Sequence, residues 1–197
     1  MNRVFFGIDP GKQGFLVLYS EEVGKHEFHT MPEKEVPTGK ILKSGKPQME
    51  LAFNPDGFRD LILDINTRFK GRKLFFVVED VLGREGWSAQ TTFNFGHTAG
   101  MQLMIPIMLG ATYVLVRPQK WQSIMYRGVE KVRKPSSTGK TMVHDTKATS
   151  ALVAQKLYPE IDFRRNPEST RSTKIDDNKT DAFLMCEFAR THQFKDA

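Results

Sequence analysis

The stretch that decides the fold is residues 4–19, which read VFFGIDPGKQGFLVLY. One apolar run leads to Asp9, a turn follows, and a second apolar run leaves the turn. This pattern predicts a β-hairpin whose turn uses Pro10, Gly11 and Gly14. A carboxylate in an apolar strand is costly unless backbone N–H groups or a cation compensate its charge. Asp9 is therefore either a turn cap or a metal ligand, and this stretch alone leaves both possibilities open.

The composition is that of an ordinary globular protein. The 197 residues can bury a sizeable core, are most simply one domain, and are 39% hydrophobic and 26% charged. No apolar run approaches the roughly eighteen residues that span a bilayer, and no signal peptide opens the chain, so we expect no membrane partner. The single cysteine, Cys186, excludes an internal disulfide framework and fits the cytoplasm or another reducing compartment. Its apolar helical surroundings predict a buried, inert thiol.

The net charge of +6 is unevenly distributed along the chain. Residues 1–116 carry 13 lysines and arginines against 13 acidic residues, whereas residues 117–179 carry 14 against 7. A basic C-terminal half predicts contacts with a phosphate backbone. A solvated basic face without a partner would have the same composition, so charge alone does not decide between the two.

The rest of the pattern predicts alternating strands and helices. A continuous apolar run at 73–79 predicts a central strand buried on both faces, and it ends in Glu79. His26 and His29, in a predicted strand at 25–31, are expected to face solvent. The segment 32–47 is rich in lysine, glycine and proline and predicts a loop or extended excursion. The other predicted elements are helices at 55–69, 88–109, 118–121, 144–157 and 174–189, a strand at 111–116, and a basic flexible segment at about 127–143.

One motif in the basic segment is misleading. Gly139-Lys140-Thr141 resembles the end of a phosphate-binding loop. However, Lys134 stands where that motif needs its first glycine, and no apolar strand precedes it. We therefore expect no nucleotide cofactor.

Four carboxylates occupy informative positions. Asp9 lies inside the first strand, Glu79 ends the fourth, and Asp177 and Asp181 lie four residues apart at the start of the last helix. Residues four apart share a helix face, where like charges repel unless a cation compensates them. If the first and fourth strands are neighbours, all four converge on one point. Such oxygen-rich ligation suits Mg²⁺ or Mn²⁺, and two ions roughly 4 Å apart support phosphodiester cleavage.

At these residues the chain resembles a known family, the RuvC-like Holliday-junction resolvases of the RNase H-like (retroviral-integrase) superfamily. The matching motifs are Gly7-Ile8-Asp9-Pro10-Gly11 with Gly14, then Val78-Glu79, then the segment 177–182. A Pro-x-x-Trp segment at 118–121 and an Ala-x-x-Leu-Tyr-Pro-Glu segment at 154–160 are similar to the branch found in phages and in the chloroplast resolvase. The resemblance spans most of the chain, but the segment 32–48 has no counterpart.

The resemblance implies the fold and the activity. The expected fold is α/β: one RNase H-like nuclease domain over 1–197, with a mixed five-stranded sheet whose first three strands are antiparallel and helices on both faces. The expected activity is that of a homodimeric, metal-dependent endonuclease that places symmetric nicks across a four-way DNA junction or other branched DNA. The helix at 88–109 is the expected dimer contact. A phage-infected cell, a nucleoid or an organelle would be its place of action.

The resemblance also implies the site residues. Asp9, Glu79 and Asp181 carry over as catalytic ligands of two Mg²⁺ or Mn²⁺ ions. Many resolvases have the fourth acid three residues before the last, where this chain has Asn178, but the more similar branch has it four before, at Asp177. Asp176 remains a third possibility for this ligand. Lys174 is expected to contact the scissile phosphate or to stabilise the leaving group.

DNA contacts are expected from the loop after Glu79, from the turn beside Asp9 and from the basic half. Family members insert the loop after this glutamate into the junction centre, and an aromatic side chain there can stack on a base for about 1–3 kcal/mol. For Trp87, packing at the start of a helix is an equal alternative. The predicted DNA-binding residues are Lys12, Gln13, Leu82, Arg84, Trp87, Lys120, Lys131, Arg133, Lys134 and Lys140.

Three other functions fit parts of the sequence. A different RNase H-like nuclease, acting on RNA or an RNA–DNA hybrid, would use the same carboxylates. An actin-like ATPase or sugar kinase shares the Gly-Ile-Asp-x-Gly pattern but needs two such halves, and this chain has one. A catalytically silent DNA-binding module is disfavoured, because a protein that only binds a polyanion has no use for clustered negative charge.

Overall fold

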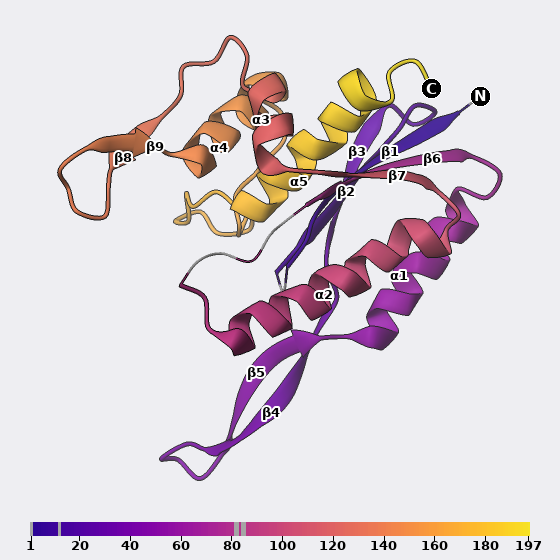
Figure 1. The fold of residues 1–197 in the computed structure, drawn as a ribbon. Coiled ribbons are helices and arrows are strands. Elements are labelled where there is room, and N and C mark those ends of the chain that lie inside the picture. Colours follow the sequence, from indigo (N-terminus) through magenta and orange to yellow (C-terminus); the bar gives the residue numbers. More distant parts are fainter. Residues whose placement is uncertain (1, 12, 81–82, 84–85) are drawn as a thin grey trace.

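The computed structural model describes residues 2–11, 13–80, 83 and 86–197. Lys12, Leu82 and Arg84, which are predicted to contact DNA, therefore lie outside the described residues. A sheet stands at the centre of the molecule with helices on both of its faces (Figure 1). Its five strands are β1 (Arg3–Asp9), β2 (Phe15–Ser20), β3 (Lys25–Thr30), β6 (Lys73–Glu79) and β7 (Thr112–Val116).

The sheet is mixed, with the strand order β3-β2-β1-β6-β7. β1 and β2 pair antiparallel, as do β2 and β3, whereas β6 is parallel to both β1 and β7. Three antiparallel strands extended by two parallel ones form the RNase H-like arrangement, so the predicted fold class is confirmed. Since β1 and β6 are parallel neighbours, their carboxyl ends meet at one edge of the sheet.

The helices divide between the two faces (Figure 1). In β1, Phe6 and Ile8 pack against α1 and α2, while Phe5 points to the opposite face and packs with α5, as the alternation of a strand requires. None of the helices in the described part of the chain combines the length and apolar character needed to cross a membrane. The helices are α1 (Pro55–Arg68), α2 (Ala89–Met108), α3 (Pro118–Met125), α4 (Thr146–Leu157) and α5 (Asp177–Phe188), which continues into a short π-helix, η1 (Ala189–Gln193).

Two antiparallel hairpins project from this body (Figure 1). The larger pairs β4 (Glu33–Ile41) with β5 (Pro47–Phe53). Of the two alternatives predicted for 32–47, a loop is therefore wrong, and the extended excursion is a paired hairpin. Its glycines and prolines lie at a register shift between Pro37 and Ile41 and at a tight turn. They obscure, in the sequence, the pattern of two paired strands. The smaller pairs β8 (Arg133–Pro135) with β9 (Met142–His144), inside the segment predicted to be flexible. That flexibility stays a prediction.

Helix α5 is the most buried helix-forming stretch, and its polar residues need partners. Eight of its 12 residues are buried, including Cys186, as expected for an inert thiol. Glu187 is buried too, and its Oε1 lies 2.9 Å from Nε2 of His26 while its other oxygen accepts a hydrogen bond from Arg190. The prediction that His26 faces solvent is wrong, because α5 covers this face of β3 and leaves only 3% of the His26 side chain exposed.

Gly7 allows α5 to cross directly over β1. A methyl group at Gly7 would overlap the carbonyl oxygen of Ala182 and the backbone nitrogen of Cys186. Both obstacles are backbone atoms of α5, which cannot rotate aside as a flexible side chain would. This contact sets how closely the start of α5 approaches the end of β1.

We expect Gly7→Ala to reduce the free energy of unfolding by about 3 kcal/mol, the upper end of the usual cost of overpacking, since the helix has to move away from the strand. Urea denaturation measures this effect. Gly100→Ala in α2 is the matched control, because nothing lies near an added methyl group there. The control should be neutral or gain up to about 1 kcal/mol from helix propensity. Equal stability of the two variants would contradict the role given to Gly7.

Candidate active site

The carboxylates predicted to form the site line one cavity at the carboxyl edge of the sheet. Asp9 and Glu79 are the last residues of β1 and β6, and their preceding residues, Ile8 and Val78, are register partners. Asp177 and Asp181 come from the first turns of α5. The cavity has a volume of about 500 Å³ and is lined by Asp9, Pro10, Gly11, Gln13, Gly14, Glu79, Trp87, Phe95, Lys147, Asp177, Asn178 and Asp181.

Burial and mutual repulsion favour protons on two of these carboxylates. Burial raises the pKa of Asp9 well above its ordinary value, and the charges of Glu79 and Asp181 raise it further. Burial also raises the pKa of Asp181, to about 7, although a hydrogen bond from Ser150 opposes the shift. The carboxyl oxygen Oδ1 of Asp181 is buried and makes no hydrogen bond within the described residues. Such an arrangement is unfavourable without a cation.

Two of the carboxylates have partners that hold them. The indole Nε1 of Trp121, a fully buried residue of α3, donates to Oε1 of Glu79 at 3.0 Å. Nζ of Lys147, at the start of α4, lies 2.7 Å from Oδ2 of Asp177. Trp121 belongs to the Pro-x-x-Trp segment, which therefore positions a site carboxylate.

The donor set fits a hard divalent cation by its chemistry. All four side chains offer carboxylate oxygens, and the unpartnered Oδ1 of Asp181 is an oxygen for which a cation is a suitable partner. In the described part of the chain, no three histidine, cysteine, aspartate or glutamate side chains already surround a single point as ligands. Ligation of one ion by three of them thus requires these side chains to come closer together than they lie here.

Backbone contacts hold the turn after Asp9. Gln102, a buried residue of α2, accepts a hydrogen bond from the Gly11 N–H at 2.9 Å and donates to the Gly11 carbonyl at 2.8 Å. A methyl group at Gly14 would lie 2.6 Å from the Asp9 carbonyl oxygen, which explains the glycine. Nδ2 of Asn178 donates to the Gln13 carbonyl at 2.7 Å and so joins α5 to this turn. Gln102 was not predicted; a glutamine within an apolar helix was the only signal.

The three candidates for the fourth ligand have different surroundings at the start of α5. Asp176 is the N-cap, since its Oδ1 accepts hydrogen bonds from the backbone N–H groups of Asn178 and Lys179. Asn178 is held by the turn after Asp9, as described above. Asp177 and Asn178 both line the cavity, and the Asp177 carboxylate lies beside Lys147 there. Of these two, Asp177 is the one that offers a carboxylate.

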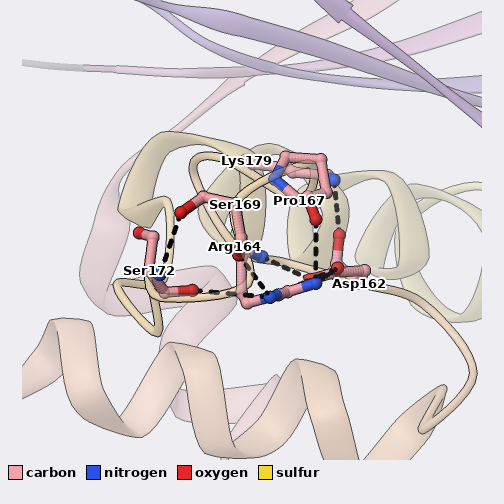
Figure 2. Close-up of polar contacts among 6 residues, drawn as sticks. All are labelled: Asp162, Arg164, Pro167, Ser169, Ser172 and Lys179. Carbon is pink, nitrogen blue, oxygen red and sulfur yellow. Dashed lines mark hydrogen bonds and ion pairs between the residues drawn. The ribbon is translucent and has the colours of Figure 1, made fainter.

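A network around Arg164 organises the segment that leads into α5 (Figure 2). The Arg164 guanidinium binds the Asp162 carboxylate, the nearest contact being 2.6 Å, and donates to the carbonyls of Pro167, Ser169 and Ser172. Lys179 of α5 donates to the Asp162 carbonyl at 2.6 Å. The segment is thus tied back to the helix that carries Asp177 and Asp181.

Lys174 and Lys147 differ in their relation to the cavity. Lys174, the predicted catalytic lysine, is exposed in the segment before α5 and is not among the residues that line the cavity. Its backbone carbonyl accepts a hydrogen bond from Arg165. Lys147 lines the cavity and was not predicted. Its position in sequence, between an N-cap and an amphipathic helix, carries no signal of this placement.

The described residues among the predicted DNA contacts fall into two groups. Gln13 and Trp87 line the cavity, and the Trp87 ring packs edge-on against Phe95 at 5.3 Å between centroids. Lys134 forms an ion pair with Asp145 at 3.3 Å. The other basic residues are exposed on α3 and on the β8–β9 side of the molecule, away from the cavity lining: Lys120, Lys131, Arg133 and Lys140.

No protein-family model matches the chain, and no curated protein matches it. Among solved structures, a Thermus thermophilus RuvC in complex with a Holliday junction substrate is 14% identical, with 96% of each chain covered and a TM-score of 0.49. A second Thermus thermophilus RuvC structure is 16% identical over 95% of this chain and 96% of that one, with a TM-score of 0.46. Because both TM-scores lie below 0.5, the fold is established here by the strand order and strand directions.

We expect Asp181→Asn to change how stability depends on pH in metal-free solution. The folded pKa of about 7 exceeds the ordinary value of 3.8, so the folded protein binds a proton that the unfolded chain releases. Stability should therefore fall as pH rises from about 4 to about 7, at about 1.4 kcal/mol per pKa unit, and asparagine should remove this loss. Urea denaturation in chelator should show the variant more stable than the wild type by a few kcal/mol at about pH 8 and similar to it at about pH 4. Parallel curves for the two proteins would contradict the assignment.

Proposed function

We propose that this protein is a structure-selective endonuclease that resolves four-way DNA junctions by symmetric, metal-dependent hydrolysis of phosphodiester bonds. The observation that carries the proposal is the convergence of Asp9, Glu79, Asp177 and Asp181 on one cavity of an RNase H-like sheet. The buried, unpartnered oxygen of Asp181 supports a cation at this point. A binding protein for DNA would gain nothing from four carboxylates there.

In this proposal the four carboxylates hold Mg²⁺ or Mn²⁺. Two such ions would activate a water molecule and stabilise the leaving oxygen. Trp121 keeps the Glu79 carboxylate directed into the cavity through its indole N–H. Lys147, whose ammonium lies beside Asp177, offers a positive charge that a scissile phosphate can approach. The Trp87 and Phe95 rings form an apolar wall of the same cavity, on which a base or sugar can pack.

The rest of the proposal concerns the partners. The basic residues of the C-terminal half bind DNA backbone, which makes affinity strongly salt-dependent. The protein acts as a homodimer, because symmetric cleavage needs two active sites. The exposed apolar side chains of α2, Phe93, Met104, Ile107 and Met108, are the contact surface that we propose for the second copy. The single cysteine fits a reducing compartment as the place of action.

The deciding experiment compares a labelled four-way DNA junction with a linear duplex of the same sequence, with Mg²⁺ and with chelator. We expect paired nicks on opposite strands, in the junction only and with metal only. Asp9→Asn should abolish cleavage and should preserve or tighten junction binding, since it removes a negative charge facing phosphate. Retained cleavage by this variant would refute the metal site.

Two other outcomes would assign a different function. If the protein cleaves an RNA–DNA hybrid and leaves the junction uncut, the metal site stands, but the protein is an RNase H-like nuclease that acts on RNA. Tight junction binding without cleavage of any substrate would make it a silent binding module.

A pair of lysine variants tests which lysine serves the reaction. Lys147→Met should lower the cleavage rate at saturating DNA by about 10- to 100-fold, because it removes a charge-assisted contact worth roughly 1.5–3 kcal/mol from the cavity. Lys174→Met is the matched control, and its rate should change less than about threefold if its exposed position excludes it from the reaction. The reverse order of effects would restore the role predicted for Lys174 from sequence.

A further inference from the structure

The β4–β5 hairpin carries a basic tip that neither the core nor the cavity uses. Every residue from 39 to 51 is exposed. Between Glu35 and Glu50 the chain has three lysines, Lys40, Lys43 and Lys46, and no acidic residue. None of these lysines forms an ion pair within the described part of the chain. The tip is thus an uncompensated positive charge at the end of a projecting arm (Figure 1).

The hairpin leaves the sheet at the edge that carries the candidate active site. Asp9 of β1 is opposite Phe15 of β2, and Phe15 is opposite Thr30, the last residue of β3. Since neighbouring strands lie about 4.8 Å apart, Thr30 is two strands, or about 10 Å, from Asp9 across the sheet. β4 begins three residues later, at Glu33.

The root of the hairpin is held firmly. The Asn54 N–H donates to the Pro32 carbonyl at 3.0 Å, and Glu33 pairs with Phe53 directly beyond them. Phe53 packs against Phe58 of α1, with 5.1 Å between ring centroids. The arm therefore has a defined direction where it leaves the body.

A groove connects the root to the candidate active site. It has a volume of about 610 Å³ and lies between β5, with Leu51 and Phe53 among its lining residues, and the first half of α2. Phe95 of α2 lines both this groove and the cavity that holds the carboxylates. The arm and the cavity are thus parts of one continuous surface.

The length of the arm sets what it can reach. β4 has nine residues, and at about 3.3 Å per residue it spans about 30 Å. A B-DNA strand advances about 3.4 Å per nucleotide, so this length corresponds to about nine base pairs, slightly less than one helical turn. A duplex that leaves the cavity in the direction of the hairpin would pass the tip at about this distance from the root of the hairpin.

We propose that the β4–β5 hairpin is a DNA-binding arm whose three tip lysines contact the phosphate backbone of a duplex arm about nine base pairs from the cleaved phosphate. Ile41 and Leu42 are 68% and 47% exposed between the lysines, and apolar side chains next to basic ones suit a groove wall of sugar and base edges. The inference rests on the proposed function, because it takes DNA as the molecule in the cavity. It assigns junction arms, in addition to the junction centre, as a recognised part of the substrate.

The test uses the triple variant Lys40→Gln/Lys43→Gln/Lys46→Gln and junctions of two sizes. Arms closed by DNA loops stay paired even at about 6 base pairs, a length that does not reach the tip, whereas arms of about 16 base pairs pass it. For long arms we expect the variant to lose about tenfold in affinity and its log–log salt slope to fall by about 2–3, at about 0.9 for each phosphate contact. For short arms its affinity should change less than about twofold, because the tip has no phosphate to contact.

The matched control removes the same charge at the opposite edge of the sheet. Lys25, Lys70 and Lys73 are exposed at that edge, and Lys25→Gln/Lys70→Gln/Lys73→Gln should bind both junctions as the wild type does. A second variant replaces residues 37–49 by an Asn-Gly turn between the paired Val36 and Glu50, and it should reproduce the loss for long arms.

The outcomes separate this inference from the proposed function. Suppose that the wild type cleaves the junction and that the hairpin variants bind long-armed junctions as tightly as the wild type does. This result would refute DNA binding by the hairpin and would leave the proposed endonuclease activity standing. An equal loss of affinity for short-armed and long-armed junctions would also refute DNA binding by the hairpin tip, since the contact would not depend on the length of the DNA arm. A wild type without junction cleavage would instead be a failure of the proposed function.

Discussion

The structure depends on the close contact between Gly7 of β1 and the backbone of α5. Nothing larger than hydrogen fits between them, so at Gly7 the backbone of the helix lies directly against the backbone of the strand. Because the contact involves Ala182, the residue after Asp181, the same approach that excludes a side chain brings Asp181 beside Asp9. The site is therefore a direct consequence of how tightly two elements pack, and the precision of the carboxylate positions comes from backbone contact instead of from loop conformation.

Two buried carboxylates of α5, Asp181 and Glu187, have pKa values that are shifted in opposite directions. Burial alone would raise the pKa of Glu187, but hydrogen bonds from His26 and Arg190 outweigh it and lower the pKa, so this side chain is a compensated ion. Burial raises the pKa of Asp181, and the hydrogen bond from Ser150 is too weak to reverse the shift. Six residues apart, Glu187 accepts hydrogen bonds from the Arg190 guanidinium, whereas the more distant charge of Lys147 does not offset the burial of Asp181. Local compensation serves stability at Glu187, and its absence at Asp181 leaves a site that an external cation can satisfy.

The sequence was informative where the chemistry is local. The apolar runs before Asp9 and Glu79 predicted two strands, and the spacing of Asp177 and Asp181 placed both acids on one helix face, because strand period and helix period are local properties. The arrangement of the sheet that brings these acids together came from the resemblance to RuvC-like resolvases. Lys147 and Gln102 were missed, since their roles depend on which helix lies over which strand end. The strand pairing of the β4–β5 hairpin was not predicted, because Pro37, Gly39 and Gly45 indicate a loop or an extended excursion in sequence. In the structure Gly39 and Gly45 occupy left-handed positions within the paired hairpin. His26 was misjudged for a third reason: a partner far along the chain, Glu187, changes what burial costs.

The two hydrogen bonds between Gln102 and Gly11 have a mechanical consequence. They attach α2 to the turn that follows Asp9, and both are shielded from water by the burial of the glutamine. A displacement of α2 along its axis must either break both bonds or drag the turn, and with it the end of β1. The outer side of the same helix presents Phe93, Met104 and Met108 to the surroundings. A molecule that binds to this outer side and displaces α2 would therefore also displace Asp9, because the Gln102 side chain connects the helix to the turn after Asp9.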